Sequence, residues 1–245
     1  MLNLDYIGFP LLIKITPLST IAEKVIAFNK QLHYTGLLPD AFSVLNPFRQ
    51  NPETIKVMSE FYYKFYNDNR QRKFLVGINP SRHGAALTGV PFTDTKRLES
   101  TCGIKMETCY SHEPSSVFIY EMIEAYGGAA AFYNNVYINS PFPLAIIKNT
   151  ANGKFLNANY YDDKDLFRAV KPFMVACLRE HVALGLQTDR VFILGKKNAQ
   201  FLEAINREAK LFGELVVLEH PRFIQQYKSK DKGLYIEKYI AALES

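Results

Sequence analysis

Cysteine is scarce in this sequence and long hydrophobic runs are absent, and both features exclude classes of protein. Cys102, Cys109 and Cys177 form an odd set without a Cys-x-x-Cys pair, so neither a disulfide framework nor a zinc knuckle is indicated. No apolar run approaches the roughly 18 residues that a membrane span needs. The apolar stretch 2–15 lacks a basic leader and is interrupted by charged residues, so it does not indicate a signal peptide. We therefore expect no membrane partner and a reducing, cytoplasmic environment.

Three common catalytic or nucleotide-binding motifs are missing as well. Gly84 and Gly89 have the spacing of a phosphate loop, but Val90 stands where the lysine of that loop must be. No Gly-x-Gly-x-x-Gly follows an apolar run, so a dinucleotide site has no support. Gly-x-Ser-x-Gly is absent too, which argues against a nucleophile elbow. The net charge of +5 permits a polyanionic partner without requiring one.

One domain spanning 1–245 is the simplest organisation, because no internal repeat and no Gly- or Ser-rich linker divides the chain. A helical portion at about 19–70 begins with a capping box at Thr20 and has a second helix start at Asn51. Four short apolar runs that follow are typical of buried strands: 74–78, 136–138, 191–194 and 215–218. Helical patterns separate these runs. The alternation predicts a three-layer α/β fold, with a central four-stranded parallel sheet and helices on both faces.

Polar and aromatic residues follow the predicted strands, at the edge where such sheets bind ligands. Asn79 comes after the first strand, Asn139 after the second and His220 after the fourth, while Phe92 lies on a Gly- and Pro-rich loop. Each residue alone is better explained as a turn former or a core residue than as part of a site. Together they converge on one edge of the sheet, which favours a binding site. The lack of Asp, Glu, Cys and Ser at these strand tips argues against ordinary hydrolase or metal chemistry.

The segment after the first strand resembles the first motif of the uracil-DNA glycosylase superfamily. Its matching residues are Gly77-Ile78-Asn79-Pro80, Gly84 and Thr88-Gly89-Val90-Pro91-Phe92, and they are most similar to the single-strand-selective monofunctional (SMUG-like) branch. Asn139 with Pro143-Leu144 is similar to the base-reading segment of that branch, and His220-Pro221 to its histidine motif. The series covers about 45–242. Ser81 replaces a family glycine, and the residues after Pro221 do not align, which indicates a diverged branch.

The resemblance implies a monofunctional DNA glycosylase that hydrolyses the N-glycosidic bond of uracil, or of a related deaminated or modified base, without metal or cofactor. It assigns His220 to stabilising the departing base and Asn79 to holding the attacking water. Asn139 reads uracil, because its amide accepts from N3–H and donates to O4. Phe92 stacks on the extruded base. The other expected base-binding residues are Ser81, Arg82 and Gly84.

A basic segment follows the histidine motif and, taken alone, is typical of a solvated surface loop. The resemblance places it where the family inserts a wedge into DNA. Arg222, Phe223 and Tyr227 are the wedge candidates, and Lys228, Lys230 and Lys232 are the candidates for phosphate contacts. Single- or double-stranded DNA is thus the expected partner of a monomeric enzyme, which would be associated with the nucleoid in a prokaryote.

Two other functions remain open at this point. One is a nucleic-acid-binding module on the same fold that has lost catalysis, because Ser81 crowds the pocket. The other is an α/β enzyme that acts on free nucleosides or nucleotides. The resemblance also leaves open whether uracil, a 5-substituted uracil, xanthine or hypoxanthine is preferred, and whether the strand is single or paired.

Overall fold

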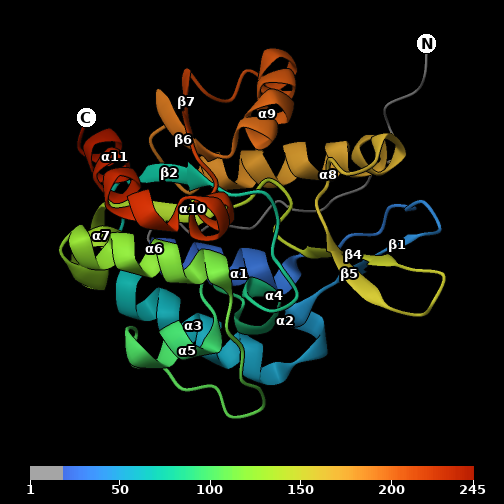
Figure 1. Cartoon of the computed structure of the whole chain (residues 1–245), viewed down its shortest axis with the longest axis horizontal. Coiled ribbons are helices and arrows are strands. Elements are labelled where there is room, and N and C mark those ends of the chain that lie inside the picture. Colours follow the sequence, from blue (N-terminus) through green and yellow to red (C-terminus); the bar gives the residue numbers. More distant parts are fainter. Residues whose placement is uncertain (1–18) are drawn as a thin grey trace.

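The computed structural model describes residues 19–245, and its centre is a four-stranded parallel sheet (Figure 1). The strand order is β3-β2-β6-β7, and every neighbouring pair is parallel. The strands are β2 (Lys73–Val76), β3 (Val136–Asn139), β6 (Arg190–Leu194) and β7 (Glu214–Leu218). All four predicted strands are confirmed, with ends shifted by one or two residues. Segment 1–18, for which the sequence does not indicate a signal peptide, lies outside the described residues.

The carboxyl ends of these strands lie side by side. Val76 pairs with Asn139 across β2 and β3, and Leu194 pairs with Leu218 across β6 and β7. Each pairing is extended by one backbone hydrogen bond, from the N–H of Gly77 to the carbonyl of Asn139 (2.8 Å) and from the N–H of Gly195 to that of Leu218 (2.7 Å). The loops that follow the strands therefore leave the sheet at one edge, as the sequence predicts.

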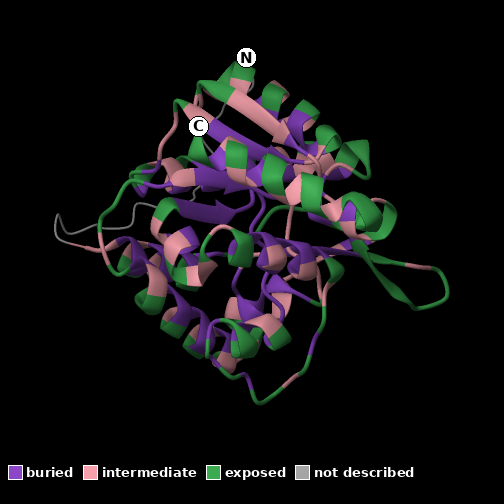
Figure 2. Cartoon of the chain, turned by 60° about the vertical axis from the view of Figure 1, so that its left-hand side comes forward, coloured by how far each residue is buried: buried purple, intermediate pink, exposed green. Residues whose placement is uncertain are grey.

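Helices flank this sheet, and several begin at the capping residues that the sequence indicates. Thr20 and Glu23 form the capping box of α1, Asn51 caps α3, and Asp163 caps α8 through bonds to two backbone N–H groups. The longer helices are α1 (Ile21–Gln31), α3 (Pro52–Tyr66), α6 (Pro114–Ala125), α7 (Gly128–Asn135), α8 (Lys164–Ala183), α9 (Lys196–Ala209) and α11 (Lys232–Glu244). Short helices are α2 (Pro47–Gln50), α4 (Ala85–Thr88) and α5 (Thr95–Ser100). Buried residues are concentrated in the sheet and on the inner helix faces (Figure 2).

A second, antiparallel sheet was not predicted. It has the order β1-β4-β5, with β1 (Phe42–Leu45), β4 (Ala145–Asn149) and β5 (Phe155–Ala158). The outer parts of β4 and β5 are exposed, so these strands lack the continuous apolar run that marks a central strand. Strand β1 lies between α1 and α3, so the N-terminal portion that the sequence predicts as helical also contributes a strand.

The basic segment after His220 is mostly helical, so the interpretation as a surface loop is wrong. It forms α10 (Pro221–Tyr227), a 3-10 turn η1 (Ser229–Asp231) and the start of α11. His220 is the N-cap of α10 and Pro221 occupies its first turn, where the ring is tolerated. Among residues 19–245, no helix is both long and apolar enough to cross a membrane.

Candidate active site

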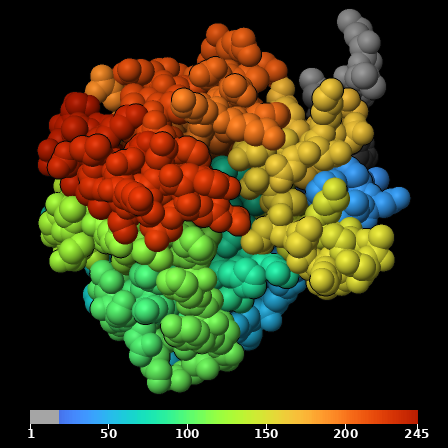
Figure 3. Space-filling model, in the orientation of Figure 1, coloured from blue at the N-terminus to red at the C-terminus, as the bar shows by residue number. Residues whose placement is uncertain are grey.

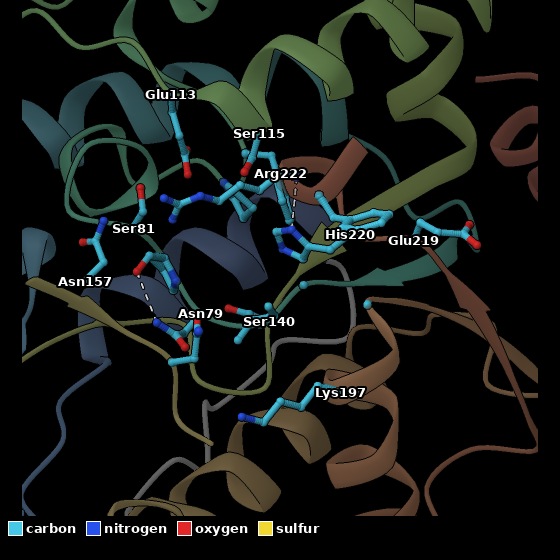
Figure 4. Close-up of a pocket in the computed structure, with 18 of the residues that line it drawn as sticks. Asn79, Ser81, Glu113, Ser115, Ser140, Asn157, Lys197, Glu219, His220 and Arg222 are labelled. Atoms are coloured by element: carbon cyan, nitrogen blue, oxygen red, sulfur yellow. Dashed lines mark hydrogen bonds between the residues drawn. The ribbon is translucent and has the colours of Figure 1, made fainter. Parts of the chain in front are cut away.

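A pocket of about 760 Å³ opens at the carboxyl edge of the parallel sheet (Figure 4). Its walls come from the loops after β2, β3, β6 and β7, from the end of β5, from the start of α6 and from α10. The predicted site residues that line it are Asn79, Ser81, Phe92, Asn139, His220, Arg222, Phe223, Tyr227 and Lys228. Those that do not line it are Arg82, Gly84, Lys230 and Lys232. In Figure 3 the teal loop after β2 lies recessed between the red α10 region and the yellow region around β5.

Asn79 is anchored to the chain that leaves β5. Its Nδ2 donates to the carbonyl of Ala158 at 3.0 Å and to that of Pro80 at 3.3 Å, and its Oδ1 accepts from the N–H of Tyr160 at 3.1 Å. These bonds fix the amide against rotation and leave one lone pair of Oδ1 for a water molecule. Since an amide is not a base, Asn79 can orient a water but cannot deprotonate it.

His220 is held in one tautomer. Its Nδ1 accepts a hydrogen bond from the backbone N–H of Arg222 at 3.2 Å, so the proton of the neutral ring is on Nε2. Desolvation, assisted by the positive charge of Arg222, lowers the pKa of His220 to about 4. The side chain is therefore a neutral donor at physiological pH. The chain at Gly195 packs against it, because a Cβ there would lie 3.3 Å from the His220 Cβ and φ is +98°.

Phe92 forms an aromatic wall beside His220. The two ring centroids are 6.1 Å apart. The Phe92 ring lies on the backbone of Gly77, where an added Cβ would come within 2.8 Å of the ring. Phe92 also has a φ of +54°, an uncommon conformation for a residue with a side chain. The close approach and the backbone strain together fix the position of the ring, as is typical of functional sites.

Asn139 is the last residue of β3 and is buried at the base of the pocket. Its Oδ1 accepts from the N–H of Ser140 at 2.9 Å, and its Nδ2 donates to the Tyr137 hydroxyl at 2.8 Å. Each polar atom of the amide retains capacity for one further hydrogen bond. Asn139 can therefore present one acceptor and one donor side by side to a ligand.

Two acidic residues on different sides of the pocket were not predicted from the sequence (Figure 4). Glu113, just before α6, and Glu219, beside His220, both line the pocket, so the statement that acidic residues are lacking there is wrong. Burial raises the pKa of the Glu113 carboxyl; the charge of Asp94 adds to this effect, whereas Ser81 and Arg222 oppose it. Figure 4 shows the Ser81 hydroxyl directed toward Glu113. Only the adjacency of Glu219 to His220 was visible in the sequence.

Small and main-chain groups line the corner of the pocket beside Glu113. A Cβ at Gly84 would overlap the Glu113 carboxylate, so glycine is what lets the carboxylate lie there. The backbone N–H of Arg82 donates to Oδ1 of Asn157, a pocket residue of β5, at 3.0 Å. Ser81 has no positive φ; in the described part of the chain only Phe92 and Lys210 combine a side chain with that conformation. The serine at the family's glycine position is thus accommodated without this kind of strain.

The outer wall of the pocket is formed by exposed residues of α10. Phe223 and Tyr227 are 44% and 71% exposed, and their ring centroids are 5.6 Å apart. Lys230 is exposed, whereas Lys232 forms an ion pair with Glu121 of α6 at 2.5 Å. The sequence predicts that Lys232 binds phosphate like Lys228 and Lys230, but its ion pair with Glu121 distinguishes it from them. Lys196 and Lys197, which were not among the predicted site residues, also line the pocket.

No cluster of three or more His, Cys, Asp or Glu side chains suited to a metal ion occurs within residues 19–245. The polar groups that line the pocket are mainly amides, hydroxyls, a neutral imidazole and lysines. These groups can bind and orient an uncharged heterocycle and a phosphate backbone.

Comparisons with known proteins agree with this arrangement. A family profile described as "Uracil DNA glycosylase superfamily" matches residues 63–244. Among solved structures, the chain is similar to "The crystal structure of WT Pedobacter heparinus SMUG2", with 52% sequence identity and a TM-score of 0.89. That similarity covers 92% of this chain and 97% of the other. A search of curated proteins gave no match.

Proposed function

Because this chain belongs to the uracil-DNA glycosylase superfamily and is a DNA glycosylase of base excision repair, we propose that it excises uracil with Asn79, Asn139 and His220 as its central residues. The observation that carries this assignment is the state of His220. Its neutral ring, with the proton on Nε2, lines the same pocket as an amide suited to uracil.

Hydrolysis of the N-glycosidic bond leaves the bonding electron pair on the base and positive charge at C1′ of the sugar. His220 donates from Nε2–H to the pyrimidine O2, where negative charge accumulates as the bond breaks. A donor aimed at such developing charge typically lowers the barrier by about 2.7–4 kcal/mol. A neutral donor needs no protonation event, so this contribution is present throughout the physiological pH range.

Asn79 positions the water that attacks C1′. The free lone pair of its Oδ1 accepts a hydrogen bond from that water, and the bonds to residues 158–160 keep the amide in place. Because Asn79 cannot deprotonate the water, the water is a weak nucleophile until C1′ carries positive charge. Uracil therefore departs first. The water then adds to the sugar cation and releases its proton to solvent.

Asn139 and Phe92 recognise the extruded base. Oδ1 of Asn139 accepts from uracil N3–H and Nδ2 donates to O4, whereas cytosine presents the opposite pattern. A mismatched pair in a buried pocket leaves polar groups unsatisfied, at about 1–3 kcal/mol each. Stacking on Phe92 adds about 1–3 kcal/mol without regard to base identity. Main-chain groups of Ser81, Arg82 and Gly84 form the rest of the binding site for the base.

DNA is contacted by the outer wall. Phe223 and Tyr227 lie on the exposed side of α10 and, together with Arg222, occupy the space left by the extruded nucleotide. The Arg222 side chain is directed toward Glu113 and Ser81 (Figure 4). Lys228 at the pocket mouth and exposed Lys230 bind phosphates.

We assign the protein to the reducing cytoplasm, in keeping with its free thiols at Cys102, Cys109 and Cys177, and we propose that it acts as a monomer.

The proposal that Ser81 abolishes catalysis has no support from the pocket, because a volume of about 760 Å³ remains with the serine in place. Uracil occupies only part of this volume, so 5-substituted uracils and deaminated purines are further candidate substrates.

The decisive experiment is a panel of single-turnover excision assays. It compares uracil, 5-hydroxymethyluracil, xanthine and hypoxanthine in single- and double-stranded oligonucleotides, with free deoxyuridine as a separate substrate. Excision of none of these bases from DNA would contradict the proposed function, and hydrolysis of free deoxyuridine alone would indicate a nucleoside hydrolase.

A further inference from the structure

Behind Asn139, on the side away from the pocket, lies a buried chain of polar groups that the reaction does not use. Tyr137 is two residues earlier on β3, so its side chain is on the same face of the strand as that of Asn139. The Tyr137 hydroxyl accepts from Asn139 Nδ2 at 2.8 Å and lies 3.4 Å from Nδ1 of His181 on α8. Tyr137 and His181 are both fully buried. Polar groups in such a place are costly unless they are satisfied, and they restrict the geometry of what they contact.

His181 is surrounded by aromatic rings. Its ring centroid lies 5.1 Å from that of Phe28 and 5.5 Å from that of Phe74. Desolvation lowers the pKa of His181 to about 3, and the backbone of Ser140 has a smaller, opposite effect. The imidazole is therefore neutral and has one donor and one acceptor nitrogen.

The two orientations of the Asn139 amide are nearly identical in shape, so only its hydrogen-bond partners distinguish them. In the orientation observed, Oδ1 faces the N–H of Ser140 and Nδ2 faces Tyr137. The flipped amide would place its NH₂ group against the Ser140 N–H, which is a repulsion between two donors. It would also require the Tyr137 hydroxyl to donate to Asn139 rather than to accept from it.

The direction of donation along the chain follows from these contacts. The Ser140 N–H holds Oδ1 of Asn139, so Nδ2 is directed at the Tyr137 oxygen, and the hydroxyl proton of Tyr137 is left for Nδ1 of His181, its other neighbour. Nε2 of His181 then carries the ring proton; it is buried and has no hydrogen-bond partner among the described residues. Once Tyr137 donates to His181, its oxygen can only accept from Asn139 Nδ2. Asn139 is then left with an acceptor oxygen and one N–H for the ligand, which is the pattern that matches uracil.

We propose that Tyr137, His181 and the backbone of Ser140 are a positioning network that fixes the Asn139 amide in the orientation that reads uracil and rejects cytosine. This inference rests on the proposed role of Asn139 in base recognition. It assigns a specificity function to two residues that do not line the pocket and are fully buried in the core. A purely structural network would change stability and leave base selectivity as it is.

The test is the binding of non-cleavable DNA that carries either 2′-fluoro-2′-deoxyuridine or 2′-fluoro-2′-deoxycytidine at one position. The ratio of the two dissociation constants measures base selectivity without chemistry. We expect Tyr137→Phe to reduce this ratio about three- to tenfold, the change that one neutral hydrogen bond produces. We expect His181→Phe to reduce it at least as much, because the tyrosine hydroxyl is then free to donate to a flipped Asn139.

A double variant and a matched control make the test specific. In the Tyr137→Phe background, His181→Phe should have no further effect on the ratio, because His181 acts only through the tyrosine hydroxyl. Tyr133→Phe removes another buried hydroxyl, one that bonds to Tyr120 away from the pocket, and should leave the ratio unchanged. Thermal unfolding of all variants separates changes in stability from changes in selectivity.

The failure of this inference and that of the proposed function look different. If Asn139→Ala abolishes selectivity while Tyr137→Phe and His181→Phe leave it at the wild-type value, Asn139 reads the base and the positioning network is overturned. If the wild-type protein does not discriminate between the two analogues and Asn139→Ala changes nothing, both the network and the role of Asn139 are wrong.

Discussion

On the sheet side of the pocket the amides of Asn79 and Asn139 are each held by two or more hydrogen bonds, whereas the aromatic side chains on α10 are exposed. Asn79 makes three hydrogen bonds and Asn139 two, both within the wall formed by β2, β3 and β5. Across the pocket, Phe223 and Tyr227 contact each other and are largely exposed. His220 stands between the two regions as the N-cap of α10.

This difference separates two tasks. Recognition and catalysis require atoms held within fractions of an ångström, and the sheet side supplies that rigidity before the substrate arrives. Binding to DNA must be independent of the sequence and tolerate different backbone conformations, for which exposed aromatic rings and lysines are suited. Changes on the sheet side should therefore alter excision rate or base choice, and changes on α10 should alter DNA affinity.

The largest effect is expected where the two regions meet. His220→Ala removes the donor to the departing base and should lower single-turnover excision about 100-fold or more. Asn79→Ala should lower it at least about tenfold. Asn79→Ala should also lower the thermal unfolding temperature, because its bonds to residues 158–160 are lost. His220→Ala should leave the affinity for DNA nearly unchanged. Near-wild-type single-turnover rates in both variants would contradict these roles.

Asn139→Asp should change base choice. A carboxylate cannot donate to uracil O4, so we expect uracil excision at neutral pH to fall about tenfold or more. Protonation of the aspartate restores a donor, so the variant should gain activity as the pH is lowered, relative to the wild-type protein in the same buffers. The measurement is the single-turnover rate against pH for both proteins. A constant ratio of the two rates would show that residue 139 does not donate to the base.

On the α10 side, the lysines should differ from one another. Replacing Lys228 and Lys230 by Gln should weaken DNA binding regardless of sequence and flatten the slope of log K against log salt by about 1.5–2 units. Lys232→Gln is the matched control. Because Lys232 is paired with Glu121, this change should alter the slope much less. Equal effects of all three lysines would mean that DNA displaces Glu121 from the pair.

Ser81→Gly is expected to have a smaller effect, confined to bulky bases. The serine hydroxyl lies beside Glu113 in the pocket corner, so its removal frees space next to the base. We expect the ratio of excision rates for 5-hydroxymethyluracil and uracil to rise by about two- to fivefold, less than 1 kcal/mol in barrier. A ratio that is unchanged or lower would show that Ser81 does not limit access to this corner.

The smallest effect expected is a flat pH profile. The pKa of His220 is lowered from 6.5 to about 4, so the ring stays neutral and excision should show no inflection near pH 6.5 from this residue. The depressed pKa also means that the fold loses stability as the pH falls from 6.5 to about 4, because the unfolded chain binds a proton at His220 that the folded protein does not. An inflection near 6.5 that disappears in His220→Gln would contradict the neutral state.

The sequence predicted the parallel sheet, because strands buried on both faces have continuous apolar runs. It also predicted that the residues after these strands lie close together, because the carboxyl ends of parallel strands lie at one edge of the sheet. It missed β4 and β5, whose outer halves are exposed and whose pairing is long-range. Glu113 could not be found either. It precedes a helix rather than a strand, and only packing brings it beside Ser81. The helical state of α10 was indicated by Pro221, but the density of basic residues favoured a loop.

The end of β5 and the two residues after it have two roles. Ala158 pairs with Ile146 in the small antiparallel sheet, and Ala158 and Tyr160 hold the side chain of Asn79. Two of the three hydrogen bonds of the Asn79 side chain therefore depend on the chain at the end of that sheet. Partial melting of the β1-β4-β5 unit would release Asn79 even with the parallel sheet intact. If Asn79 has the proposed role, we expect excision to be lost on heating at the temperature at which this small unit opens, below the one at which the whole chain unfolds.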